Sequence, residues 1–263
     1  MCMTNDSRNY FQKCPNTHEP TLGPGISFMD QRSNNKTQRL QQWFDERPRW
    51  DHASYGEFMH IGANQTIFRI ALEEQEISTE TKVLDTACAV GGNARWMASL
   101  FGCQVWGNDI DEEALVVARD LAEIENISEL CTFVEAPVEA LPFDDNTFNI
   151  VVTTDVFDSN EVKRVLKPGG SFIVISLFED PKITPIQLAE RWGLQLETSL
   201  DVTDLAFAFN RAKETEARLL HESDLIGARE LIDIMNKSIA PYTHGGRHYI
   251  MRLRKSNQIP KHQ

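Results

Sequence analysis

The sequence predicts an α/β fold built on a doubly wound, mostly parallel sheet. Two observations support this prediction: from Lys82 onward short apolar segments alternate with helical ones, and each strand-and-helix unit has the size of a right-handed crossover. The 263 residues suffice for one large domain of this class. Ligands of such sheets bind beyond the carboxyl ends of the strands, so the candidate site is expected there.

The elements follow one another in a clear order. Apolar residues at helical spacing predict short helices near residues 40–44 and 67–71, ahead of the sheet. The turn at residues 167–170, Lys-Pro-Gly-Gly, is expected to separate two of the strands. The remaining elements are expected as strands at 83–84 and 105–106 with helices after Gly91 and Asp111, strands at 131–134, 149–153 and 172–178, a mostly helical stretch at 203–238 and a strand-like close at 247–255.

Composition and charge narrow the class of partner. Lys plus Arg number 26 and Asp plus Glu 39, so the formal charge is 26 − 39 = −13. Such an acidic chain repels phosphate backbones, and no nucleic acid is expected as a partner. No apolar run reaches the length of a membrane span and the first 20 residues lack the apolar core of a signal peptide, so we expect no membrane and a cytoplasmic protein. The five cysteines show no C-x-x-C or zinc spacing, so no metal site is predicted.

The segment from Lys82 to Asn93 carries the chemistry. A buried strand runs into a turn of small residues, Ala87, Ala89 and Gly91, and then into a helix. Small residues let the backbone approach a ligand closely, and the helix presents its positive amino-terminal end. The next strand ends at Asp109, where a carboxylate can accept both hydroxyls of a ribose. A turn made tight for packing alone is the alternative interpretation of this segment.

Four linked motifs resemble the class I S-adenosylmethionine-dependent methyltransferases across residues 82–180. They are Asp85 with its small-residue turn, Asp109, Leu141-Pro142-Phe143 followed by Phe148, and the Arg164 to Gly170 segment. The resemblance implies a Rossmann-like sheet of seven strands with the last strand antiparallel, an N-terminal helical lid, and S-adenosyl-L-methionine as cofactor. It places the expected cofactor-binding residues at Asp85, Ala87, Ala89, Gly91, Asp109, Ile110 and Val138.

The chain departs from the family pattern in three places. Ala87 and Ala89 replace two glycines, which we expect to be tolerated through negative φ angles. Pro137 takes the usual acid position and leaves the Val138 N–H as the remaining adenine contact. Residues 154–161 are shorter than the family pattern, which removes much of a helix whose start faces the acceptor.

Upstream, residues 55–62 resemble a motif of glycine, sarcosine and dimethylglycine N-methyltransferases and of tocopherol and phosphobase methyltransferases. In that subgroup the region closes over cofactor and acceptor, which adds Ile61 and Gly62 to the expected cofactor contacts. The expected domains are a flexible tail at 1–36 and a methyltransferase domain at 37–263. Within that domain we expect a helical cap at 37–80, a cofactor-binding core at 82–180 and substrate-side helices with the closing strand at 181–263.

The predicted function is transfer of a methyl group to a small-molecule acceptor, most simply an amine nitrogen, by in-line displacement. Candidate catalytic residues are Tyr55, Glu57, His60 and Asp155, with Tyr242, His244 and Tyr249 near the last strand. Packing or solvated roles remain open for each of them. An O- or C-directed methyltransferase and a cofactor-binding protein without methyl transfer also stay open, as does assembly as a homodimer.

Overall fold

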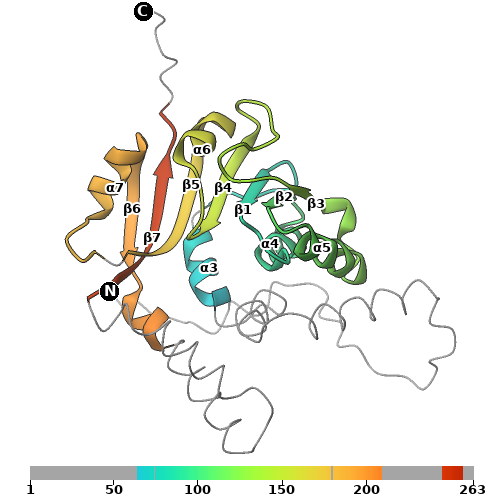
Figure 1. The fold of residues 1–263 in the computed structure, drawn as a ribbon, viewed down its shortest axis with the longest axis horizontal. Helices are drawn as coiled ribbons and strands as arrows, with labels where there is room; N and C mark the ends of the chain where they lie inside the picture. The colour runs from blue at the N-terminus through green and yellow to red at the C-terminus, as the bar shows by residue number, and fades with distance from the viewer. Residues whose placement is uncertain (1–63, 74, 179, 209–244, 257–263) are drawn as a thin grey trace, which may run out of the picture.

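The sheet has seven strands in the order β3-β2-β1-β4-β5-β7-β6 in the computed structural model, which describes residues 64–73, 75–178, 180–208 and 245–256 (Figure 1). The strands are β1 (Lys82–Thr86), β2 (Gln104–Asp109), β3 (Cys131–Glu135), β4 (Phe148–Thr154), β5 (Leu166–Phe178), β6 (Gln195–Asp201) and β7 (Arg247–Arg254). The helices are α3 (Asn64–Leu72), α4 (Gly92–Phe101), α5 (Glu112–Ile124), the 3₁₀ turn η2 (Ser128–Leu130), α6 (Ser159–Val165) and α7 (Pro185–Trp192).

Strand direction confirms the predicted fold class. β1 pairs in parallel with both β2 and β4, β3 extends the sheet beyond β2, and β5 continues it beyond β4. β7 runs antiparallel between β5 and β6. The chain therefore leaves β1 toward one side of the sheet and returns to its other side through β4. This arrangement places a topological switch point, where ligands bind in such sheets, at the carboxyl ends of β1 and β4.

Helices cover both faces of the sheet, as doubly wound folds require (Figure 1). One apolar cluster joins α3, α4 and α5 to the sheet face that carries Val83, and a second joins α6 and α7 to the face that carries Leu84. Both of these neighbouring β1 side chains are fully buried. Burial on both faces explains why Val83 and Leu84 are both apolar, where a strand with one exposed face would alternate apolar and polar residues.

Local signals fix where the helices begin and end. The Asp111 carboxylate accepts the Ala114 N–H at 3.1 Å and caps α5. Thr184 and Gln187 form a reciprocal capping box at the start of α7, and Gly193 ends that helix with φ of 66°. Capping of this kind contributes about 1 kcal/mol per helix end, so the boundaries follow from the sequence locally.

Two expectations differ from the structure. Strand β6 was not among the predicted strands, because only Leu196 and Leu200 interrupt its polar, mostly exposed residues. The segment 167–170, expected as a turn between strands, lies inside β5. There the pairing with β4 jumps from Phe148 and Leu166 to Ile150 and Ser171, so the segment forms an irregularity within the strand. The tail at 1–36 and all of the predicted lid that precedes α3 lie outside the described residues.

Arg164 joins two of the sequence motifs physically. Its guanidinium donates to the backbone carbonyls of Leu141 at 2.8 Å and Phe143 at 2.6 Å, and it pairs with Glu161 at 2.7 Å. Glu161 in turn accepts the Leu141 N–H at 2.8 Å. The loop between β3 and β4 is therefore tied to α6, which explains why the Leu-Pro-Phe motif and the arginine occur together.

Replacing this arginine tests the tie. We expect Arg164→Ala to lower the free energy of unfolding by about 2 kcal/mol, because the two carbonyls lose their charged donor. Urea unfolding measures the loss. The exposed Arg191 on α7 gives a matched control, and Arg191→Ala should change stability by less than about 0.5 kcal/mol. Equal losses in the two variants would contradict the proposed tie.

Candidate functional site

The candidate site lies at the switch point, where the carboxyl ends of β1, β2 and β4 meet. The structure brings together there the turn of residues 87–91 after β1, Asp109 at the end of β2, and Asp155 after β4. Hydrogen bonds across the strands fix this edge: the Cys88 N–H donates to the Asn108 carbonyl at 2.9 Å, and the Asp155 N–H donates to the Ile175 carbonyl at 3.1 Å. The three predicted positions therefore lie at the same edge of the sheet, and their role in a site stays a prediction.

The turn after β1 adopts a left-handed backbone. Ala87 has φ of 52° and Ala89 of 49°, so the expectation that both alanines have negative φ was wrong. A left-handed conformation costs a residue with a Cβ about 1 to 2 kcal/mol. The chain meets that cost through a charged hydrogen bond, because the Ala89 N–H donates to Asp109 Oδ2 at 2.8 Å. Strain of this kind tends to cluster at functional sites.

Gly91 closes the turn and precedes α4. Its φ is 70°, and a Cβ at this position would lie 2.5 Å from the Phe133 ring on β3. Glycine is therefore required both by the backbone and by packing against β3. The sequence alone did not distinguish this packing role from a role in cofactor binding. Cofactor binding by Gly91 therefore stays a prediction.

Asp85 carries the most unusual carboxyl group of the candidate site. It is 2% exposed, and its Oδ2 has no hydrogen-bond partner among the described residues. Burial raises the pKa of the Asp85 carboxyl to about 8, the backbone N–H of Ala94 at the start of α4 lowers it, and repulsion from Asp109 raises it further. A buried carboxyl of this kind is a marker of functional sites.

Asp109 and Ile110 lie on the β2 side of this edge of the sheet. The two carboxylate oxygens of Asp109 accept the backbone N–H groups of Ala89 and, at 3.0 Å, Asp111. A carboxylate offers about four lone-pair sites, so these two bonds leave room for two hydroxyl donors. Ile110 is 73% exposed, which places an apolar side chain at the rim beside the acid. Val138, in the loop after β3, is half-buried.

Asp155 is also held in the left-handed region, with φ of 71°. Its Oδ1 accepts the Ser176 hydroxyl at 2.7 Å and the Leu177 N–H at 3.2 Å, both at the carboxyl end of β5. The next carbonyl, of Val156, accepts hydroxyls from Thr86 at 3.0 Å and Thr153 at 2.8 Å. The exposed carboxylate is therefore fixed at the sheet edge by several independent contacts.

Several contributors were missed by the sequence analysis. None of these residues belongs to a recognised sequence motif, and only their positions at the ends of strands could have indicated that they contribute. They are Thr86, Asn108 and Ser176. Five predicted residues, Tyr55, Glu57, His60, Ile61 and Gly62, lie outside the described residues, as do Tyr242 and His244. Tyr249 lies on β7 opposite Ser176, with its ring 6.2 Å from that of Phe178.

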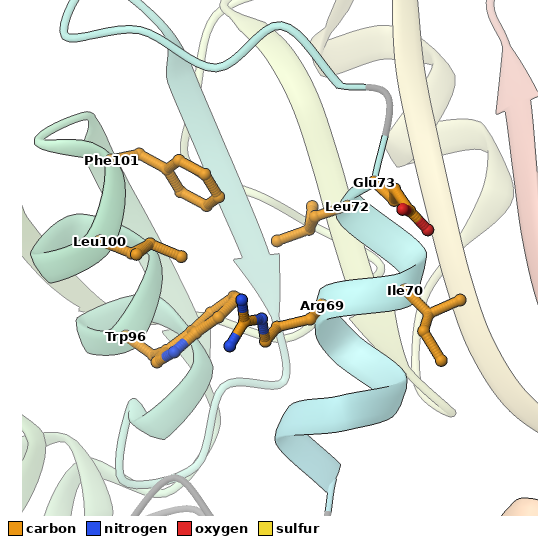
Figure 2. A pocket seen from close by; sticks show the side chains of 7 residues that line it. All are labelled: Arg69, Ile70, Leu72, Glu73, Trp96, Leu100 and Phe101. Carbon is orange, nitrogen blue, oxygen red and sulfur yellow. The ribbon is translucent and has the colours of Figure 1, made fainter. Parts of the chain in front are cut away.

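A separate pocket of about 500 Å³ lies between α3 and α4 (Figure 2). In Figure 2 the side chain of Arg69 extends from α3 toward Trp96 on α4. Leu100 and Phe101, at the end of α4, also line it. Because α4 begins directly after the turn of residues 87–91 and ends here, the pocket lies away from the switch point, and none of the predicted site residues lines it. In the described part of the chain no group of three metal-ligating side chains occurs, and no helix could span a bilayer.

Comparison with known proteins identifies the same part of the chain as the sequence motifs. Residues 84–174 match the family described as a methyltransferase domain. A glycine/sarcosine/dimethylglycine N-methyltransferase of Actinopolyspora halophila is 32% identical over 150 residues, which are 49% of this chain and 26% of that protein. A sarcosine/dimethylglycine N-methyltransferase of Halorhodospira halochloris is 29% identical over 146 residues, 48% of this chain and 51% of that protein. The matched stretch thus spans about half of these curated relatives or less.

A solved structure shares the fold. The Haemonchus contortus phosphoethanolamine N-methyltransferase 2, in complex with phosphomonomethylethanolamine and S-adenosylhomocysteine, superposes with a TM-score of 0.66 at 18% identity. The superposition covers 83% of this chain and 61% of that chain. At this identity the likeness shows the fold alone.

The raised pKa of Asp85 predicts a pH dependence of stability. The folded protein keeps the Asp85 proton up to about pH 8, whereas the unfolded chain loses it near the ordinary value of 3.8. Between these values the folded state binds more protons, so this group lowers stability as pH rises. We expect Asp85→Asn, which stays neutral, to gain stability relative to the unmodified protein by up to about 1.4 kcal/mol per pH unit from pH 5 to 8. Urea unfolding at each pH measures the gain.

The exposed Asp144 provides the control for this series, since Asp144→Asn removes a carboxyl group that is not buried. A parallel pH dependence in the Asp85→Asn and unmodified proteins would show that this carboxyl does not titrate as described.

The strained turn predicts an unusual effect of glycine. Ala89→Gly relieves about 1 to 2 kcal/mol of backbone strain and loses about 0.5 to 1 kcal/mol through the greater freedom of the unfolded chain. The variant should therefore be as stable as the unmodified protein or more stable by up to about 1.5 kcal/mol. Ala118→Gly, inside α5, should instead lose at least about 1 kcal/mol. Thermal unfolding compares the two, and a similar loss in both would contradict the left-handed assignment.

Proposed function

We propose, on the premise that residues 84–174 form a class I S-adenosyl-L-methionine-dependent methyltransferase domain, that this chain transfers a methyl group to a small-molecule amine. The observation that carries the proposal is the strained turn of residues 87–91, held against Asp109 at the switch point of the sheet. The strained backbone lies at the edge of the sheet where ligands of such folds bind, which supports the proposal.

The residues present fit the cofactor. Asp85 contributes a buried carboxyl oxygen without a partner among the described residues, and Asp109 keeps lone pairs for two ribose hydroxyls. Ile110 offers an exposed apolar surface for a flat base. We assign Ala87, Ala89 and Gly91 to the amino-acid part of the cofactor and Val138 to its adenine. The bound cofactor supplies the electrophilic methyl group, and the protein's part is to bind and orient it.

The acceptor is proposed to lie beside Asp155. Displacement at a sulfonium needs an unprotonated acceptor nitrogen in line with the methyl group, so placement supplies most of the rate. The Asp155 carboxylate is fixed through Oδ1 by Ser176 and Leu177. Its exposed position lets it orient an ammonium or take up its proton. The N-methyltransferase relatives and the net charge of −13 support an amine over a neutral acceptor.

The remaining parts of the chain are assigned to the acceptor side. We propose that residues 37–80, with Tyr55, Glu57, His60, Ile61 and Gly62, cap the crevice, and that residues 181–263 complete its wall. The shortened segment after Asp155 agrees with this assignment, because α6 has only 7 residues and begins beyond Asp158. The experiment must distinguish the proposed amine acceptor from a hydroxyl acceptor, from a carbon acceptor, and from cofactor binding without methyl transfer.

Cofactor binding is tested first. S-adenosylmethionine or S-adenosylhomocysteine at about 100 times its Kd should stabilise the protein by about 2.7 kcal/mol, a rise in Tm of about 5 to 10 °C. Asp109→Ala should remove most of that rise because it removes the acceptor of the ribose hydroxyls. Asp111→Ala, which removes a neighbouring carboxylate that caps α5, should lower the Tm itself and keep the ligand-induced rise. No rise in the unmodified protein at millimolar ligand would overturn the proposal.

Transfer is tested with methyl-labelled cofactor and pools of small amines, hydroxyl compounds and carbon acids. Label should enter the amine pool, and Asp155→Asn should lower kcat/KM by about 100-fold or more while leaving the ligand-induced rise in Tm intact. Label in another pool would replace the amine with that acceptor. Binding without label in any pool would leave a cofactor-binding protein.

A further inference from the structure

Two carboxyl groups and a thiol act on one another around the turn after β1, where Asp85 and Cys88 are buried and Asp109 is half-buried. Asp85 on β1, Asp109 at the end of β2 and Cys88 in the turn interact electrostatically. Burial, and then the two aspartates, raise the pKa of the Cys88 thiol well above its usual value, so this cysteine remains a neutral thiol. Any negative charge of the cluster is therefore carried by a carboxyl group, and Asp85, whose pKa burial raises to about 8, is protonated at neutral pH in the free protein.

The surrounding elements supply little compensating charge to Asp85. On α4 the Arg95 guanidinium bonds to Glu125 at the far end of α5. On α5 Arg119 bonds to Glu112 at 2.8 Å and to the Phe133 carbonyl at 3.1 Å, and it acts on Cys88. Strand β4, with the sequence FNIVVTT, has no ionisable side chain. Among the described residues, the groups that act on the Asp85 carboxyl are the Ala94 N–H, which favours its ionisation, and Asp109, which opposes it.

We propose that Asp85 makes the crevice discriminate between the methyl donor, a sulfonium cation, and its demethylated product, a neutral thioether. This inference rests on the proposed function. Its geometric basis is the buried Asp85 carboxyl, whose Oδ2 lacks a partner in the described structure, at the base of the turn that would hold the sulfonium. A positive charge bound nearby in a site of low dielectric stabilises the ionised carboxylate, and a neutral sulfur does not.

The proton balance follows from this difference. When the sulfonium binds, the Asp85 carboxyl releases its proton to the solvent and remains as a carboxylate beside the cation. When methyl transfer converts the sulfonium into the thioether, the carboxylate loses its counter-charge and takes up a proton again. The product is thereby held less tightly than the donor at neutral and higher pH, which favours its release.

The test is a calorimetric titration of the full chain with S-adenosylmethionine and, separately, S-adenosylhomocysteine. At each pH the titration is run in two buffers of different ionisation enthalpy, and the difference between the two binding enthalpies gives the number of protons released. The donor should release more protons than the product at pH 7. The ratio of the product's Kd to the donor's Kd should rise by about tenfold or more from pH 6 to pH 8, since a shift of one pKa unit corresponds to a tenfold change. In Asp85→Asn, the difference in proton release between donor and product and the rise of the Kd ratio with pH should both lose the part that Asp85 contributes.

Two control variants isolate the contribution of Asp85. The ligands' own amino groups also titrate, and the Asp85→Asn variant measures their background directly. Asp144→Asn, at an exposed site, should reproduce the unmodified protein. Circular dichroism establishes whether Asp85→Asn is folded, and if it is not, Asp85→Ser takes its place as the neutral variant that measures the background.

The outcomes distinguish the two levels of the proposal. Binding of both ligands with equal proton release and a ratio that does not change with pH would overturn the role of Asp85 while leaving cofactor binding in place. Absence of binding by either ligand would overturn the proposed function itself. A pH-dependent ratio that persists in a folded Asp85→Asn variant would assign the discrimination to another group and also overturn the inference.

Discussion

The left-handed backbone of the turn after β1 is the constraint on which the crevice depends. Ala87 and Ala89 hold this conformation against a cost of about 1 to 2 kcal/mol each. The charged hydrogen bond from the Ala89 N–H to Asp109 offsets a large part of it, since such bonds contribute about 1.5 to 3 kcal/mol. The fit of Gly91 under the Phe133 ring fixes the start of α4 in the same step. Residues of β2 and β3 therefore stabilise the conformation of the turn that follows β1.

The other positions with positive φ show that this placement is specific. Two of them in the described chain, Asn126 and Asn146, are asparagines, which tolerate the left-handed region well. Asp155 also enters this region more readily than most residues, and it is held there by Ser176, by a backbone N–H and by the clamped carbonyl next to it. The strain that the chain must actively maintain thus lies in the turn after β1, at the switch point between β1 and β4.

Much of this architecture could be predicted because it depends on local patterns. The buried core of β1 is the apolar pair Val83 and Leu84, and the linked motifs around Asp85, Asp109 and Arg164 indicated the fold and the edge of the sheet proposed for the site. The positive φ angles of Ala87 and Ala89 could not be predicted from the local sequence, and the carboxylate that accepts the Ala89 N–H, that of Asp109, is 20 residues away. Strand β6 escaped detection because an exposed edge strand carries few apolar residues. The contact between Ser176 and Asp155 joins two strand ends and leaves no mark in the local sequence.

The central claim is that the crevice between the turn of residues 87–91 and Asp109 holds the adenosyl cofactor. A crystal structure of the full chain grown with S-adenosylhomocysteine tests it most directly. The account predicts ligand density over the turn, with both ribose hydroxyls on the Asp109 carboxylate and the adenine against Ile110. Density for the ligand at another place, such as the pocket between α3 and α4, with the turn and Asp109 unliganded, would contradict it.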